Sequence, residues 1–227
     1  MKRITITLFA LIIAGVFCSV GSASQLIDNL KAEKQQTLVT YGTSLTAGGA
    51  WVGQLRESLA EQYPGLINVV NAGRGAMWST WGVDNLDQRV IARQPDTVLI
   101  EFAINDAFLA YKTSVELARK NLENMIDRIL KANPKCEIVL MTMNPPVGIH
   151  LERRPDIEKY YEMYREVARE RKLPLIDHHP RWCAILNKDR GEFDRLVPDG
   201  IHPGPTGCEQ VITPFILKSL GLETTEP

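Results

Sequence analysis

The sequence predicts an α/β fold in which a five-stranded parallel sheet carries helices on both of its faces. From residue 37 onward, short runs of β-branched and other apolar residues alternate with longer segments whose apolar residues recur at helical spacing. Glycine, proline or asparagine stands at most of the junctions between them. Strands separated by helices in this rhythm are typical of a parallel sheet.

The first half of the chain contains three expected strands and two expected helices. These strands are residues 37–41, 67–71 and 97–102, and the helices between them are residues 51–63 and 80–93. Pro64 ends the first helix and Pro95 follows the second, because a proline lacks the N–H that a helix interior needs.

The second half repeats the pattern. We expect strands over residues 137–143 and 173–177 and helices over residues 114–131, 155–172 and 206–220. The helix over 114–131 has the clearest pattern, since Leu122, Met125 and Ile129 recur on one apolar face. Pro214 is expected to kink or split the last helix.

The N-terminus has the features of a secretory signal peptide over residues 1–23. Lys2 and Arg3 precede an apolar run over residues 4–20, and three small residues follow it. An uncleaved anchor is the alternative, because the run approaches spanning length. We therefore expect an exported protein, periplasmic or secreted, whose residues 24–227 form one domain with no stable membrane insertion after cleavage.

Composition limits the classes of partner. The chain has 227 residues, 44% of them hydrophobic, which is enough for one sizeable core. Its net charge of −1 and its lack of a basic stripe give no case for nucleic acid. Cys136, Cys183 and Cys208 would remain after export, which allows a disulfide such as Cys183–Cys208, and their spacing matches no metal site.

Chemically useful residues follow the first three expected strands. Ser44 follows the first strand, Gly73 the second and Asn105 the third. Ligands bind beyond the carboxyl ends of parallel strands, so we expect these residues at one site. Asp199 and His202 stand three residues apart near the end of the chain.

These residues have the chemistry of a hydrolytic triad. Ser44 would be the nucleophile, His202 its general base, and Asp199 the group that orients the histidine ring. The backbone N–H groups of Ser44 and Gly73 and the amide of Asn105 would stabilise negative charge on a carbonyl oxygen. Taken singly, each also has a simpler explanation, namely a helix cap, a loop residue or a turn.

In combination, the motifs resemble the SGNH hydrolases, the family of GDSL esterases and lipases. Residues 42–45 (Gly-Thr-Ser-Leu) resemble its first block, Gly73 and Asn105 match the second and third, and Asp199-x-x-His202 matches the last. The resemblance implies a flavodoxin-like three-layer α/β/α sandwich, a Ser/His/Asp mechanism, and no metal or organic cofactor.

Two positions depart from the family pattern. Thr43 stands where the family has aspartate, so we expect different hydrogen bonding around Ser44. Ala103 stands where glycine is usual, so we expect its methyl group to narrow the oxyanion region. The Gly-x-Ser-x-Gly elbow of α/β-hydrolases is not met, because Thr46 occupies its last position.

Other conspicuous residues have weaker interpretations. Trp78 and Trp81 are candidates for lining an acyl or sugar pocket, or for packing under a loop, and Arg74 is a candidate for binding an anionic group. His178 and His179 are expected in a loop or an active-site wall, because no further metal ligands accompany them. Residues 153–154, both arginine, are expected in a solvated loop.

The sequence therefore predicts an exported serine esterase acting on a small-molecule or carbohydrate ester. Since no exposed apolar stripe is apparent, we expect short acyl groups such as acetyl. A lysophospholipase or thioesterase-like hydrolase of longer chains is the main alternative. A non-catalytic glycan-binding protein would be expected to have lost a catalytic position, and a flavin-binding module would leave Asp199 and His202 unexplained. The oligomeric state stays open.

Overall fold

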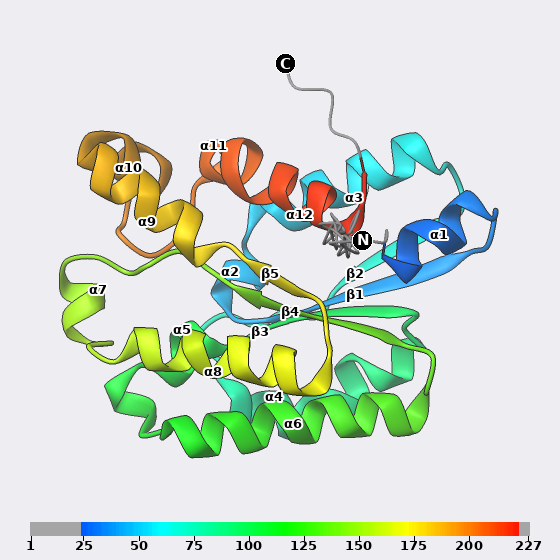
Figure 1. The fold of residues 1–227 in the computed structure, drawn as a ribbon, viewed down its shortest axis with the longest axis horizontal. Helices are drawn as coiled ribbons and strands as arrows, with labels where there is room; N and C mark the ends of the chain where they lie inside the picture. Colours follow the sequence, from blue (N-terminus) through cyan, green and yellow to red (C-terminus); the bar gives the residue numbers. More distant parts are fainter. Residues whose placement is uncertain (1–23, 223–227) are drawn as a thin grey trace, which may run out of the picture.

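A computed structural model describes residues 24–222, which are built around one parallel sheet of five strands. The strands run in the order β2-β1-β3-β4-β5 (Figure 1). Their bounds are Gln36–Gly42 for β1, Ile67–Asn71 for β2, Thr97–Glu101 for β3, Glu137–Thr142 for β4 and Leu175–Asp177 for β5. The predicted sheet is confirmed, and the predicted signal peptide lies outside the described residues.

Helices cover both faces of the sheet and complete three layers (Figure 1). One face carries α4 (Ser79–Arg89), α6 (Val115–Ala132) and α8 (Ile157–Arg171), and the other carries α1 (Gln25–Lys31), α3 (Ala50–Gln62) and α12 (Thr213–Leu220). The three-layer α/β/α sandwich is thus confirmed. Within residues 24–222, no helix is both long enough and apolar enough to span a bilayer.

Helix α6 forms for the reasons its sequence suggests. The Ser114 side chain caps its start by accepting a hydrogen bond from the Leu117 N–H. Leu122, Met125 and Ile129 are buried on one face, as their spacing predicts. Burial of this face, more than helix propensity, holds the helix against its neighbours.

Three helices of seven or more residues were not expected from the sequence, namely α1, α9 (His179–Lys188) and α10 (Arg190–Leu196). Pro180 lies in the first turn of α9, where a missing N–H costs nothing. Asp189 caps α10 by accepting a hydrogen bond from the Glu192 N–H. Cys136, Cys183 and Cys208 are all free, so no disulfide joins Cys183 to Cys208.

The last predicted helix is split, as Pro214 suggested. It consists of α11 (Pro205–Gly207), a π-helical turn η3 (Cys208–Ile212) and α12. Pro214 lies in the first turn of α12 and has no N–H to donate to the preceding turn. The π-helical geometry therefore occurs where the regular hydrogen-bond pattern is interrupted.

Short helices follow three of the strands and lie toward the left of Figure 1. They are α2 (Ser44–Ala47) after β1, α5 (Ala103–Asp106) after β3 and α7 (Ile149–Glu152) after β4, and the 3₁₀ turns η1 (Ile91–Arg93) and η2 (Leu109–Tyr111) are further connections. Because parallel strands all point the same way, α2, α5 and α7 gather at one end of the sheet.

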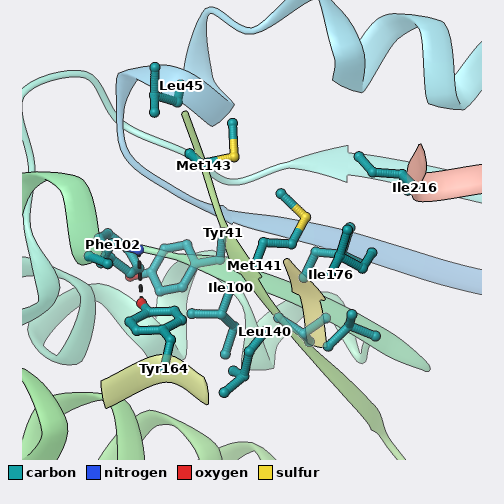
Figure 2. Close-up of a cluster of buried hydrophobic side chains, with 14 of the residues drawn as sticks. Tyr41, Leu45, Ile100, Phe102, Leu140, Met141, Met143, Tyr164, Ile176 and Ile216 are labelled. Carbon is teal, nitrogen blue, oxygen red and sulfur yellow. Dashed lines mark hydrogen bonds between the residues drawn. The ribbon is translucent and has the colours of Figure 1, made fainter. Parts of the chain in front are cut away.

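Beneath this end, aromatic side chains fill the core between the sheet and α8 (Figure 2). The rings of Tyr41 and Phe102 meet edge to face, with centroids 5.1 Å apart at 82°. The Phe102 N–H donates a 2.9 Å hydrogen bond to the buried hydroxyl of Tyr164. This bond satisfies a backbone donor at the point where β3 ends and α5 begins.

Replacing Tyr164 with phenylalanine is expected to destabilise the fold by about 1–3 kcal/mol, because the Phe102 N–H would stay buried without an acceptor. Urea unfolding measures this loss. Tyr63→Phe is the matched control, since the Tyr63 ring packs against the core and its hydroxyl has no hydrogen-bond partner among the described residues. Equal stability of the two variants would contradict the proposed role of the Tyr164 hydroxyl.

Candidate active site

Ser44 is the first residue of α2, two positions beyond the end of β1. Thr43 caps the helix, and its hydroxyl accepts a 3.2 Å hydrogen bond from the Leu45 N–H. The N–H of a first helical residue has no acceptor within its own helix, and residues 24–222 provide none for the Ser44 N–H. This N–H is therefore available to an external acceptor beside the Ser44 hydroxyl.

A buried carboxyl group, Glu101, holds the residues on either side of Ser44. It accepts hydrogen bonds from the Thr43 N–H at 2.7 Å, the Thr43 hydroxyl at 3.0 Å and the Thr46 hydroxyl at 2.7 Å. An aspartate at position 43 would place a second carboxyl group beside Glu101. Threonine at this position therefore fits its buried neighbour, which explains the local departure from the family pattern.

Burial raises the pKa of the Glu101 carboxyl to about 7, against the lowering effect of the hydrogen bonds from Thr46 and Thr43. Burial likewise raises the pKa of Asp106 to about 7, although the Ser79 N–H donates to this carboxyl at 2.9 Å. Two buried acids thus lie under this end of the sheet, one bonded to the Ser44 turn and one to the start of α4.

His202 connects Ser44 to Asp199 through both of its ring nitrogens. Its Nε2 lies 2.8 Å from the Ser44 Oγ, and its Nδ1 lies 2.6 Å from the Asp199 Oδ2. The other oxygen of Asp199 accepts the His202 N–H at 2.7 Å and the Ile201 N–H at 3.0 Å. The structure therefore brings the three predicted triad residues into one continuous chain of hydrogen bonds.

Asp199 is held in its ionised form by these contacts. Burial raises the pKa of its carboxyl, but hydrogen bonds from the His202 N–H and ring and from the Ile201 N–H outweigh burial and lower the pKa below its usual value. A carboxylate at this position fixes a proton on Nδ1 of His202, which leaves Nε2 as the acceptor facing Ser44.

The loop that carries Asp199 and His202 is tied to the segment after β4. The Val147 N–H donates to the Gly200 carbonyl at 2.9 Å, and the buried Asn144 amide donates to the Ile201 carbonyl at 3.0 Å. Gly200 has a φ of 82°, a left-handed conformation that favours glycine at this turn. The loop is thus fixed at both residues between Asp199 and His202.

The structure gives a packing reason for glycine at position 73. A Cβ at this position would lie 2.7 Å from the backbone N of Ala47 and 2.9 Å from the Thr46 side chain, so glycine permits close packing against α2. The Gly73 N–H already donates to the Asn71 side-chain oxygen at 3.0 Å. Close packing against α2 is therefore sufficient to explain glycine at this position.

Asn105 is buried at the start of the connection after β3, and both ends of its amide are engaged. Nδ2 donates to the Met77 carbonyl at 2.9 Å, and Oδ1 accepts from Arg154 at 3.1 Å. The second proton of Nδ2 remains for another acceptor. The loop that contains Met77 also brings Gly75 next to Ser44, so it connects the Asn105 amide to the Ser44 turn.

The structure corrects the expectation for Ala103 and favours the packing interpretation for Trp81. The Ala103 side chain belongs to the buried hydrophobic core, so its methyl group does not narrow the site. Trp81 packs against the core beside Tyr41, with Arg89 over its ring, so it has a packing role. Burial, not solvent contact, determines the position of both side chains.

Trp78 and Arg74 stay candidates for substrate contact. Trp78, directly before α4, stacks on Tyr111 of η2 with ring centroids 4.4 Å apart. Arg74 is exposed and forms no salt bridge with the described residues, and its backbone N–H donates to the Gly42 carbonyl. Arg74 therefore lies near the end of β1, and both side chains are at least partly accessible.

His178 and His179 lie away from Ser44, at the start of α9. His178 is fully buried with no hydrogen-bond partner among residues 24–222, and burial lowers its pKa to about 3. His179 is buried as well, in the first turn of α9, so the expectation of a loop was wrong for His179, whereas His178 lies in the short connection between β5 and α9. Their neutral rings pack within the core of this layer.

His179, Glu158 and Cys183 form the group whose donor atoms, within the described part of the chain, come close enough to share a metal ion. The His179 Nε2 lies 3.0 Å from Glu158, but Nδ1 faces the Arg165 guanidinium at 3.5 Å. A metal-bound histidine needs a hydrogen-bond acceptor at its other nitrogen, and a guanidinium is a donor. The arrangement therefore fits a hydrogen-bonded cluster better than a metal centre.

A cavity of about 420 Å³ opens beside Ser44 and His202. Leu45, Pro203 and Ile212 contribute to its mostly apolar wall. Apolar cavities with a few polar groups at one end are typical of small-molecule sites. The polar end here consists of the Ser44 hydroxyl and the His202 ring.

Three residues near the site were missed by sequence reasoning. Glu101 could have been noticed, since it is an acid at the end of an apolar strand. Arg154 was expected in solvent but is only 6% exposed. His150 lies beside Gly200, and no sequence signal distinguished it.

Comparison with known proteins places this geometry in a family. A model of the GDSL-like lipase/acylhydrolase family matches residues 39–210. An arylesterase from Vibrio mimicus is 24% identical over 195 residues, covering 83% of this chain and 90% of its own length.

Two solved structures share the fold. A lipase/acylhydrolase from Enterococcus faecalis is 25% identical with a TM-score of 0.69, covering 85% of this chain and 100% of that one. An acetylxylan esterase from Geobacillus stearothermophilus is 22% identical with a TM-score of 0.71, covering 84% and 96%.

Glu101→Gln is expected to gain stability relative to the wild type as the pH rises. Between about pH 4.5 and 7, the folded wild type keeps the Glu101 proton that the unfolded chain loses, so its stability falls with rising pH. Glutamine has no proton to lose. The free energy of unfolding of the variant, relative to that of the wild type, should therefore rise by up to about 3 kcal/mol over this pH range.

Urea unfolding near pH 4.5 and pH 7.5 measures this difference. The exposed Glu57→Gln variant controls for the loss of one negative charge from the surface. A Glu101→Gln variant whose stability relative to the wild type does not change with pH would show that Glu101 ionises as readily as in the unfolded chain.

Proposed function

Because the chain belongs to the GDSL-like lipase/acylhydrolase family and is a carboxylic ester hydrolase, we propose that Ser44, His202 and Asp199 act as its catalytic triad. The chain of hydrogen bonds from the Ser44 Oγ through the His202 ring to Asp199 supports this assignment most directly. Structures of catalytic mutants of the Geobacillus stearothermophilus esterase carry substitutions of a serine, a histidine and an aspartate, the last two three positions apart.

In the proposed reaction, Nε2 of His202 removes the Ser44 proton as Oγ attacks the ester carbonyl. The protonated ring then gives this proton to the departing alcohol, which leaves an acyl group on Ser44. Water, deprotonated by the same ring, attacks the acyl-enzyme and releases the acid. Asp199 stabilises the positive ring at each step without taking up its proton.

When Ser44 attacks, negative charge develops on the substrate's carbonyl oxygen, and this oxygen needs hydrogen-bond donors close to it. We assign this role to the Ser44 N–H and the Asn105 Nδ2, which each have a free proton in the described structure. The Gly73 N–H contributes only by sharing its proton with the Asn71 oxygen, which already accepts it. Fixed donors of this kind need no reorganisation during the reaction.

The proposed substrates are short-chain esters, with acetyl esters of carbohydrates as the first class to test. Likeness in fold to an acetylxylan esterase supports this choice, as does the stacked Trp78–Tyr111 pair near Asn105, since aromatic faces suit sugar rings. The basic head and apolar run at the N-terminus support export to a compartment where such polymers are found.

Hydrolysis of longer acyl esters is the second candidate, and an apolar rim favours it. Leu109, Ile149 and Leu151 are exposed by 59%, 50% and 44%. Their segments are joined by a hydrogen bond from the Leu109 N–H to the Arg153 carbonyl. His150, between two of them, lies beside Gly200 of the triad loop. The cavity beside Ser44 also exceeds the needs of an acetyl group.

Mature protein is expected to hydrolyse p-nitrophenyl acetate, and Ser44→Ala is expected to reduce kcat to the level of the oxyanion donors alone. Loss of a triad nucleophile removes several orders of magnitude in turnover. A matched Ser58→Ala variant also lacks a partly exposed serine hydroxyl, on α3 instead of α2, and should keep its activity. Equal activity of Ser44→Ala and the wild type would exclude Ser44 as the nucleophile.

A series of p-nitrophenyl esters from acetate to octanoate distinguishes the two substrate classes. The proposed short-chain esterase should have its highest kcat/KM at acetate. If the apolar rim binds acyl chains, Ile149→Gln with Leu151→Gln should lower kcat/KM for octanoate alone, by about tenfold, since each buried methylene is worth about 0.8 kcal/mol. Leu117→Gln, an equally exposed leucine on α6, is the control. A maximum at octanoate would overturn the acetyl-ester assignment.

A further inference from the structure

Arg154 is a buried cation with an unusual set of partners. It follows α7, and its side chain is almost completely removed from solvent. Nε donates to the Ile104 carbonyl at 2.7 Å, and a terminal nitrogen donates to the Asn105 Oδ1 at 3.1 Å. The His150 carbonyl lies 3.4 Å from the other terminal nitrogen. Every one of these acceptors is neutral.

No carboxylate lies within ion-pair distance of Arg154 in the part of the chain that the structure describes. The guanidinium carbon instead lies 4.8 Å from the centre of the Phe108 ring, over its face. Burial of a charge without a counter-ion costs free energy. Such an arrangement is retained where the charge has a use, and the nearest polar side chain is the Asn105 amide.

The contact with Arg154 determines how the Asn105 amide is oriented. An asparagine amide can in principle turn over and exchange its oxygen and nitrogen. Here Oδ1 faces a donor that has no accepting atom, and Nδ2 faces the Met77 carbonyl. Turning the amide over would bring donors against donors at one end and acceptors against acceptors at the other.

The same contact should strengthen the amide as a donor. A positive charge at Oδ1 polarises the conjugated amide and makes its N–H groups more acidic. Asn105 thus transmits the field of a buried cation, whereas solvent would screen an exposed one. The effect grows as negative charge develops on a substrate oxygen, so it acts on the transition state more than on bound substrate.

We propose that Arg154 is a positioning residue for ester hydrolysis, which orients and polarises the Asn105 amide from behind so that Nδ2 can stabilise the carbonyl oxyanion. The proposal rests on the triad and oxyanion roles proposed above. It gives the buried arginine a function through Asn105 and not through direct contact with substrate.

The first test measures kcat and KM for p-nitrophenyl acetate in Arg154→Met and Arg154→Lys. Methionine should lower kcat by about 10–100-fold with KM changed by less than about twofold, because the loss falls on the transition state. Lysine retains the charge but lacks the fork that bonds two acceptors, so its kcat should be intermediate. The adjacent, exposed Arg153→Met is the matched control and should match the wild type.

A double-mutant cycle tests whether Arg154 acts through Asn105. Asn105→Ala alone should lower kcat by about 10²–10³-fold if the amide is an oxyanion donor. Adding Arg154→Met to that variant should then lower kcat by less than about twofold, because the group that Arg154 serves is gone. A merely structural role for Arg154 would lower kcat by the same factor with or without Asn105.

Titration of reactive Ser44 with p-nitrophenyl diethyl phosphate counts the folded sites, so that kcat refers to active enzyme. If Arg154→Met does not fold, the same cycle is carried out with Arg154→Lys. If the double variant loses kcat by the product of the two single-variant factors, the positioning role of Arg154 is overturned and the triad stays intact. Wild-type kcat in both Arg154→Lys and Arg154→Met would have the same meaning. Hydrolysis that persists in Ser44→Ala would overturn the triad assignment and this inference with it.

Discussion

Parallel pairing of β1 with both β2 and β3 is the constraint on which the site depends. The register aligns Thr40 with Asn71 on one side and Gly42 with Glu101 on the other. This alignment brings the Glu101 carboxyl to the Thr43 N–H, and brings the loop after β2 alongside the start of α2. A shift of one residue would turn Glu101 to the opposite face of the sheet and leave the Ser44 turn without its acceptor.

Two buried ionisable side chains, those of Glu101 and Arg154, orient polar groups of the site through hydrogen bonds. Glu101 fixes the turn that presents the Ser44 hydroxyl and N–H, and Arg154 fixes the amide that faces it from the end of β3. Neither is part of the Ser44–His202–Asp199 chain. Burial without a counter-charge costs stability at both positions, and what it provides is polar groups that are already oriented before substrate binds. The fold is therefore less stable than it would be without these buried groups, but the polar groups of the site are held in fixed orientations.

The triad loop is positioned by a different means, since it belongs to no strand. Backbone and side-chain hydrogen bonds from Val147 and Asn144 hold Gly200 and Ile201, the two residues between Asp199 and His202. The segment after β4 therefore determines where the His202 ring lies relative to Ser44. Three strands of the sheet and one anchored loop thus supply all parts of the site.

Local signals were sufficient to predict the sheet and to select three residues that the structure connects by hydrogen bonds. The five strands are continuous apolar runs bounded by turn residues, and Ser44, Asp199 and His202 belong to motifs with fixed spacing. Helices α9 and α10 were missed because their short amphipathic patterns depend on burial against the rest of the fold.

Contacts between distant residues were not predictable in the same way. Arg153 and Arg154 are adjacent and identical in type, yet one is exposed and the other buried against Asn105. Trp78 precedes α4 and stacks on Tyr111, whereas Trp81, within α4, packs against the core. For Gly73, the sequence identified the residue but not the contact with α2 that requires glycine.

The most direct test of the account is covalent labelling with an activated phosphonate, such as a fluorophosphonate, followed by mass spectrometry of the digested protein. The phosphonate reacts with a serine only where a base removes the hydroxyl proton and donors stabilise the tetrahedral adduct. The account predicts one label per chain, on Ser44, which is lost in His202→Asn. Absence of labelling, or a label on another residue, would contradict the assignment of Ser44 as the activated nucleophile.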